Sequence, residues 1–198
     1  MINYDNLIEQ IHGNGFYIID DFLSVEHADN LQKNAHSLIA ENQFKNAKIG
    51  SQGNAVNNNT IRRDQIYWLD DNQSLPAVSA YFSAMNQIAA QLNRHLFMGL
   101  SEFETHFASY PPGSFYKKHC DQFNNKKERQ LSCVYYLNNE WEKQFGGELN
   151  IYNLSGELIT SVLPLYNRLI CFTSDLPHEV CVTKKLRLSI AGWFKTRR

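Results

Sequence analysis

LRLSIAGWF, residues 186–194, has the alternation of side chains that is typical of a β-strand. One face of this segment is apolar and consists of Leu186, Leu188 and Ile190. The other face consists of Arg187, Ser189, Ala191 and Trp193. A guanidinium on a buried strand needs an anionic partner, because an unpaired buried charge is costly. The strand has no acidic residue at a matching position, so the partner of Arg187 is either a structural Asp or Glu elsewhere or the carboxylate of a ligand.

The chain from Glu102 onward consists of short runs with a similar strand-like character. Clusters of Gly, Pro, Asn and Asp separate these runs, which are FETHFASY, LSCVYYL, ELNIY, LITSVL, RLICFT and the segment above. This pattern predicts an all-β sandwich or barrel rather than alternating β-α-β units.

The first half of the chain is predicted to contain helices. A short helix over residues 6–11 ends at Gly13 and Gly15, and residues 16–22 indicate a strand. Ser24 is a suitable N-cap, and apolar residues follow it at helical spacing: Ala28, Leu31, Ala35, Leu38 and Ile39. A further amphipathic helix carries Phe82, Met85, Ile88, Leu92 and Leu96. Residues 45–60 are rich in Asn, Gly and Ser and indicate a long loop, either functional or plain surface.

The chain shows neither an internal repeat nor a linker. We therefore expect a single domain over residues 1–198, mainly β with N-terminal helices (α+β). Residues 1–100 would form the helical support and the loop, and residues 101–198 the β-rich core.

The composition argues against two classes of partner. The formal net charge is −1, so no strong field favours nucleic acid or an anionic membrane. The sequence has no run of roughly 20 apolar residues, the length that crosses a bilayer, and its first residues do not resemble a secretory signal.

The four cysteines form no CxxC pair, so we interpret them as buried thiols and expect a cytoplasmic protein.

The β-rich half contains the constellation with the clearest chemistry. His119 and Asp121 would share one face of a strand while Cys120 points away, and His178 lies 57 residues after Asp121. Two imidazoles and one carboxylate on one face of an octahedral ion suit Fe(II) that must also bind O₂ and a co-substrate. Zinc hydrolysis also fits these three side chains, although Arg187 would have no role in it. A serine or cysteine hydrolase is disfavoured because no nucleophile motif such as GxSxG is present.

Several motifs occur in an order that resembles a known family. They are Tyr110-Pro111-Pro112-Gly113, Tyr116, His119-x-Asp121, Tyr135-Tyr136-Leu137-Asn138, Trp141, Gly146-Gly147, Pro177-His178-Glu179-Val180 and Arg187. Together they resemble the prolyl-hydroxylase branch of the 2-oxoglutarate/Fe(II) oxygenases, especially the oxygen-sensing prolyl hydroxylases and their bacterial relatives. The resemblance covers about residues 103–194 and implies a double-stranded β-helix core, of the jelly-roll type, flanked by helices.

The resemblance also implies the cofactors and the residues that bind them. Fe(II) would be held by His119, Asp121 and His178, with no further catalytic side chain. Arg187 would bind the distal carboxylate of 2-oxoglutarate, helped by Tyr110 and Tyr136. The walls of the co-substrate pocket would be Val134, Leu149 and Trp193. The co-substrates would be 2-oxoglutarate and O₂, and ascorbate would be a possible stimulant.

A second likeness concerns the substrate side. Residues 62–68, RRDQIYW, resemble the strand that follows the mobile finger loop of the family. This implies an ion pair between Asp64 and Arg129 at the rim of the cleft, with residues 45–60 closing over the substrate. Arg63 and Tyr116 are the other candidate substrate-binding residues.

The favoured function is hydroxylation of a prolyl residue in a cytosolic protein, inferred from the resemblance alone. The alternatives are hydroxylation of another side chain or of a small molecule, and a non-catalytic jelly-roll binding protein. Demethylation of nucleic acid is disfavoured by the near-neutral charge. The partner would be a protein or peptide with a target proline, not a membrane, and a monomer is the default expectation.

Overall fold

The computed structural model of the chain describes residues 2–48, 56–71, 75–122 and 127–197, which form two β-sheets and three α-helices. The larger sheet has seven strands. Their order is β1 (Phe16–Ile19), β9 (Leu169–Thr173), β6 (Arg129–Tyr136), β11 (Arg187–Thr196), β4 (Leu100–Tyr110), β3 (Gln65–Leu69) and β2 (Lys45–Asn46). The smaller sheet has four strands in the order β5 (Tyr116–His119), β10 (His178–Val180), β7 (Leu149–Tyr152) and β8 (Leu158–Val162). A 3₁₀ turn, η1 (Lys143–Phe145), precedes β7.

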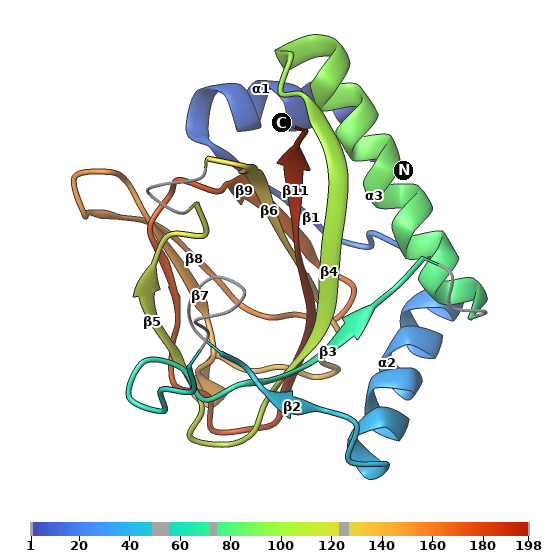
Figure 1. Cartoon of the computed structure of the whole chain (residues 1–198), viewed down its shortest axis with the longest axis vertical. Coiled ribbons are helices and arrows are strands. Elements are labelled where there is room, and N and C mark those ends of the chain that lie inside the picture. Colours follow the sequence, from blue (N-terminus) through green and yellow to red (C-terminus); the bar gives the residue numbers. More distant parts are fainter. Residues whose placement is uncertain (1, 49–55, 72–74, 123–126, 198) are drawn as a thin grey trace.

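The smaller sheet and the helices lie on opposite sides of the larger sheet (Figure 1). All strand pairs are antiparallel, and strands far apart in sequence lie side by side, as β11 does between β4 and β6. The predicted sandwich with flanking helices is therefore confirmed, and its architecture is the jelly-roll type that the resemblance implied.

Capping residues and a proline explain where the three helices begin, and a glycine explains where α1 ends. α1 (Tyr4–Asn14) starts after Asn3, whose side chain accepts from the backbone N–H of Asn6, and stops at Gly15, where φ is 77°. α2 (Val25–Ala40) has the expected N-cap, Ser24. α3 (Pro76–Leu96) begins with proline at a position where no backbone donor is needed.

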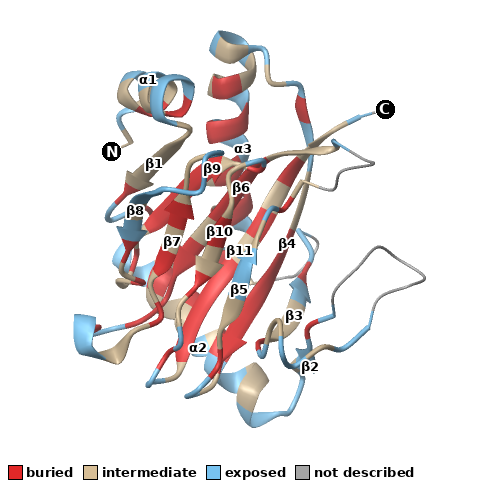
Figure 2. Cartoon of the chain, turned by 90° about the vertical axis from the view of Figure 1, so that its left-hand side faces the viewer, coloured by how far each residue is buried: buried red, intermediate tan, exposed pale blue. Residues whose placement is uncertain are grey.

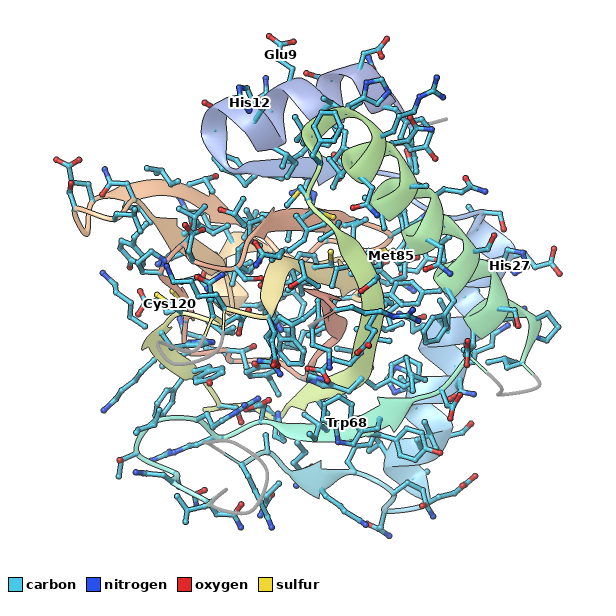
Figure 3. All side chains as sticks on the ribbon, turned by 45° about the horizontal axis from the view of Figure 1, so that its top comes forward. Glu9, His12, His27, Trp68, Met85 and Cys120 are labelled. Atoms are coloured by element: carbon cyan, nitrogen blue, oxygen red, sulfur yellow. The ribbon has the colours of Figure 1, made fainter. Side chains whose placement is uncertain are left out.

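Alternation along the strands of the larger sheet separates two apolar clusters. Leu188 and Ile190 of β11 face the helices and share a core with Leu31 of α2 and with Met85 of α3, which Figure 3 shows between its helix and the sheet. The other cluster, which includes Tyr136, lies between the two sheets. The central strands are largely buried, as Figure 2 shows, so both faces of the larger sheet are covered.

Three expectations need adjustment. The first helix is longer than residues 6–11, because Gly13 lies inside it. The first strand ends at Ile19 rather than at residue 22, since Asp21 has a φ of 51°, which no strand residue adopts. Of the expected loop 45–60, residues 45–46 form β2 and residues 49–55 lie outside the described residues. None of the helices in the described residues combines the length and the apolar character of a membrane-spanning segment.

Candidate metal and co-substrate site

Three candidate metal ligands converge between the two sheets. His119 at the end of β5 pairs in register with His178 at the start of β10, and Asp121 follows two residues after His119. Nε2 of His119 lies 3.7 Å from Oδ1 of Asp121, and Nε2 of His178 lies 3.4 Å from Oδ2. One donor atom from each of the three residues lies within 4.8 Å of the others, which is close enough for a single ion to bind all three.

The backbone orients both imidazoles for metal binding. Nδ1 of His119 lies 2.8 Å from the carbonyl oxygen of Lys117, and Nδ1 of His178 lies 3.0 Å from that of Leu176. A carbonyl only accepts, so each Nδ1 carries the hydrogen and each Nε2 presents a lone pair toward Asp121. Burial lowers the pKa of His178 to about 4, so its ring is neutral at pH 7, as metal binding requires.

Asp121 is held by a serine of the opposite sheet. The hydroxyl of Ser132 on β6 donates to Oδ2 at 2.7 Å, and it also lies 2.9 Å from the hydroxyl of Ser174. Burial would raise the pKa of Asp121, but His178 and His119 outweigh it, so the pKa lies well below its usual value. The carboxylate is therefore ionised and fixed in direction before any metal binds.

Arg187 lies at the other end of the same cavity and is only 1% exposed. Its Nε donates to the carbonyl of Gly147 at 2.9 Å, and Nη1 donates to the hydroxyl of Ser189 at 3.3 Å. Its Nη2 is buried without a partner, and no carboxylate pairs with the guanidinium in the part of the chain that the structure describes. Among the described residues, therefore, neither an Asp nor a Glu is the structural partner of Arg187. The guanidinium is available for the carboxylate of a ligand.

Glycine is required beside this arginine. Gly147 has a φ of 74°, and a Cβ there would lie 3.2 Å from Cδ of Arg187 and from Cβ of Thr183. A side chain at this position would therefore strain the backbone and press on the arginine.

The residues expected around the co-substrate surround Arg187. Its guanidinium carbon lies 4.8 Å from the ring centre of Tyr110 and 5.1 Å from that of Tyr136, whose buried hydroxyl has no hydrogen-bond partner in the part of the chain that the structure describes. Val134, Leu149 and Trp193 line the cavity, as Tyr110 does. The structure thus brings these side chains together as the resemblance implied.

The expected ion pair between Asp64 and Arg129 is wrong. Both residues are described, and each has a different partner. Asp64 is buried and accepts two hydrogen bonds from Arg62, at 2.7 and 2.5 Å. Arg129 donates to Glu104 at 2.7 Å and lies over the ring of Trp193 at 3.7 Å. Arg62 is only two residues from Asp64 on the same side of the chain, so it reaches the carboxylate in a bidentate geometry.

Arg62 also connects Asp64 to the metal ligands. Its guanidinium carbon lies 4.2 Å from the ring centre of Tyr116, and that ring stacks on His119 at 3.5 Å. Tyr116 therefore lines the cavity and supports a metal ligand. Arg63, in contrast, is exposed and donates to the carbonyl of Asn59, away from the cavity lining.

Two expectations about the residues next to the metal ligands also change. Asp121 lies beyond the end of β5, not on the strand. Cys120 is exposed, beside β5 in Figure 3, and Cys181 is half-buried, so only Cys133 and Cys171 are the buried thiols expected of all four.

Sequence reasoning missed several cavity residues. Arg62, His106, Ser132 and Ser189 line the cavity but were assigned no role. The signal for Ser132 was available, since it alternates with Val134 and Tyr136 along one face of the strand LSCVYYL.

The arrangement fits a non-haem iron centre. Two imidazoles and one carboxylate occupy one side of an ion and leave other positions free for ligands. Arg187 lines the cavity, and its Nη2 and the hydroxyl of the neighbouring Tyr136 are buried without partners among the described residues, as a site for a dicarboxylate requires. Zinc hydrolysis would leave this second half of the site without a function.

Comparisons with known proteins agree with this geometry. The family model described as the 2OG-Fe(II) oxygenase superfamily matches residues 105–195. Prolyl hydroxylase EGLN3 of Homo sapiens is 27% identical over 200 residues, covering 98% of this chain and 83% of that protein. The crystal structure of a Pseudomonas putida prolyl-4-hydroxylase is 34% identical with a TM-score of 0.88, covering 98% of this chain and 100% of that one.

A second solved structure is a prolyl hydroxylase from Trichoplax adhaerens in complex with a peptide fragment of the hypoxia inducible factor oxygen degradation domain. It has a TM-score of 0.89 at 27% identity and covers 97% of this chain and 88% of that one. A relative above 30% identity matches nearly the whole chain, and the three metal ligands lie together. The chain therefore belongs to the 2OG-Fe(II) oxygenase superfamily and is an enzyme that uses Fe(II), 2-oxoglutarate and O₂.

Proposed function

We propose that this oxygenase hydroxylates a prolyl residue within a protein or peptide. The likeness to the Trichoplax adhaerens enzyme carries this proposal, because that enzyme is described in complex with a peptide and its fold matches 97% of this chain. The curated relatives named as prolyl hydroxylases match nearly the full chain and support the same assignment.

The metal end of the cavity has a defined task. His119, Asp121 and His178 would hold Fe(II), while Ser132 and the carbonyls of Lys117 and Leu176 keep the ligand side chains in their orientation. When bound, Fe(II) and 2-oxoglutarate supply the oxidising chemistry: one oxygen atom of O₂ goes to the substrate and the other to succinate, with release of CO₂.

The opposite end of the cavity orients the co-substrate. Nη2 of Arg187 and the hydroxyl of Tyr136 are the buried polar atoms that the distal carboxylate of 2-oxoglutarate would satisfy. The apolar walls, Val134 and Leu149, exclude water from the carbon chain between its two carboxylates.

The substrate would approach from the side of β3. Arg62 and Tyr116 line the cavity, and Trp68 on β3 is a large apolar side chain that is 53% exposed. An exposed tryptophan and a tyrosine beside a small cavity suit a peptide that inserts one side chain and lays its backbone outside.

The proposed location is the cytosol. All four cysteines are free, and Sγ of Cys133 lies 3.4 Å from Sγ of Cys171, well beyond the roughly 2.05 Å of a disulfide. A buried pair of thiols in this proximity supports a reducing compartment.

The proposal is tested by incubating the purified enzyme, Fe(II) and 2-oxoglutarate with a protein extract from its host. Mass spectrometry should find a peptide that gains one oxygen atom on a proline, with succinate formed in parallel. The Asp121→Ala variant is the negative control and should give neither product. An oxygen gained on another side chain, or on a small molecule, would contradict the prolyl assignment while leaving the oxygenase activity intact.

A further inference from the structure

A histidine with no assigned role faces the cavity. His106 lies on β4, where it pairs with Ala191 of β11 on one side and with Trp68 of β3 on the other. It alternates with Ala108 and Tyr110, and all three line the cavity. Its side chain is among the buried polar groups, at 3% exposure.

One ring nitrogen of His106 has no hydrogen-bond partner among the described residues. Both tryptophan neighbours pack against it, Trp68 edge-on at 5.0 Å between ring centres and Trp193 tilted at 5.3 Å, and Figure 3 shows Trp68 on β3. The aromatic contacts hold the ring in place, but an indole ring has only a donor N–H and no conventional hydrogen-bond acceptor. Nδ1 is buried and has no partner among the described residues, which is costly unless a bound molecule supplies one.

The ring is set up as a neutral hydrogen-bonding group. Burial lowers the pKa of His106 to about 4, and the nearby charges of Asp64 and Arg62 act in opposite directions. A neutral imidazole carries one N–H donor and one acceptor nitrogen at pH 7. His106 can therefore donate to an oxygen without adding a positive charge to the cavity.

The strand register places His106 at the metal end of the cavity. Arg187, Ser189 and Ala191 lie along one face of β11, so His106, paired with Ala191, is about 13 Å from Arg187 along the strand at roughly 3.3 Å per residue. The next residue on that face, Trp193, pairs with Ser132, which holds Asp121. A dicarboxylate bound by Arg187 would thus direct its other end toward His106 and the metal ligands.

We propose that His106 donates a hydrogen bond from Nδ1 to an oxygen atom of the 2-oxo-acid end of 2-oxoglutarate. This inference rests on the proposed binding of the distal carboxylate by Arg187. It makes His106 a further co-substrate-binding residue, one that distinguishes 2-oxoglutarate from dicarboxylates without the oxo-acid group.

The test measures equilibrium binding by calorimetry, with Mn(II) in place of Fe(II) so that no turnover occurs. His106→Leu removes the donor with similar volume, and His106→Asn places an amide nitrogen near the position of Nδ1. For 2-oxoglutarate we expect the dissociation constant to rise about tenfold or more in His106→Leu and by less than about threefold in His106→Asn. For succinate, which keeps a carboxylate for Arg187 but has no oxo-acid end, we expect no change in either variant.

Three outcomes would overturn the inference. They are unchanged 2-oxoglutarate affinity in His106→Leu, an equal loss for both ligands, and an equal loss in the Leu and Asn variants. A loss confined to peptide binding would assign the hydrogen bond to the substrate instead. His106→Met serves as a second apolar variant if His106→Leu does not fold, as judged by its melting temperature without ligand.

The Arg187→Lys variant separates this inference from the proposed co-substrate site. It should weaken the binding of both 2-oxoglutarate and succinate, because both use the distal carboxylate. If Arg187→Lys leaves both affinities unchanged, the binding role of Arg187 fails, whatever the result at His106.

Discussion

Ser132 of the larger sheet donates a hydrogen bond of 2.7 Å to Asp121, the carboxylate that lies beyond the end of β5 in the smaller sheet. The contact links the two layers of the sandwich at the metal site. Asp121 is not on a strand, so its direction depends on this hydroxyl and on the neighbouring histidines rather than on a backbone ladder. The metal site is therefore a property of the packed sandwich, not of one sheet.

Replacing Ser132 with alanine should weaken metal binding. Second-layer hydrogen bonds to metal ligands typically contribute about 10–100-fold in affinity, and we expect a loss in this range for Fe(II) or Mn(II). Calorimetric titration of the metal measures it. Asp121→Ala should lose more, and Ser161→Ala, at an exposed position on β8, is the matched control that should bind like the wild type. Equal affinities for Ser132→Ala and Ser161→Ala would show that the hydrogen bond does not orient the ligand.

Replacing Arg187 with lysine should raise the KM for 2-oxoglutarate by about tenfold or more. Lysine keeps the charge but cannot form the bidentate contact with a carboxylate. Initial rates of succinate formation at varied 2-oxoglutarate measure the effect. Arg63→Lys, on an exposed arginine outside the cavity lining, should leave this KM unchanged. An unaltered KM in Arg187→Lys would refute the carboxylate-binding role.

The Asp64–Arg62 ion pair should contribute far more to stability than a surface pair. The Asp64 side chain is fully buried, and losing one partner of a buried pair costs about 3–5 kcal/mol because it leaves an uncompensated charge. We expect Asp64→Ala to lower the free energy of unfolding by this amount in urea denaturation. Asp20→Ala removes the carboxylate that pairs with Arg168 at a 60% exposed position, and should cost at most about 1 kcal/mol. Similar losses in the two variants would contradict the structural role of Asp64.

Gly192 should tolerate no side chain. A Cβ there would lie 2.7 Å from Cβ of Thr105 and 2.8 Å from the carbonyl oxygen of Glu104, both on the adjacent strand β4. Gly192→Ala would force β11 and β4 apart beside Trp193, so we expect a lower melting temperature and weaker binding of 2-oxoglutarate. In Gly13→Ala nothing lies within 4 Å of the new Cβ, and alanine in a helix should instead stabilise by roughly 0.5–1 kcal/mol. A normal melting temperature for Gly192→Ala would mean that β4 can move without cost.

The class of fold and the main parts of the site follow from local patterns in the amino-acid sequence. Alternation in LRLSIAGWF placed Arg187 on the face opposite Leu188, and the structure has it so, because strand periodicity is a local property of the backbone. The same holds for the helix that starts at Ser24, since its cap and its apolar spacing are encoded within a few residues. The pattern of motifs predicted the metal ligands His119, Asp121 and His178, because members of one family carry these residues in the same order along the chain.

Which side chains pair with one another depends on the folded structure. Asp64 pairs with Arg62 instead of Arg129, and the orphaned Nδ1 of His106 became visible only when its two tryptophan neighbours were in place. A hydrogen bond or ion pair needs its two groups within a few ångströms of each other, and the distance from Asp64 to Arg129 depends on how segments far apart in sequence pack. The amino-acid sequence contains the residue types and their spacing along the chain. The distances between their side chains arise from the register of the sheets and the packing between them.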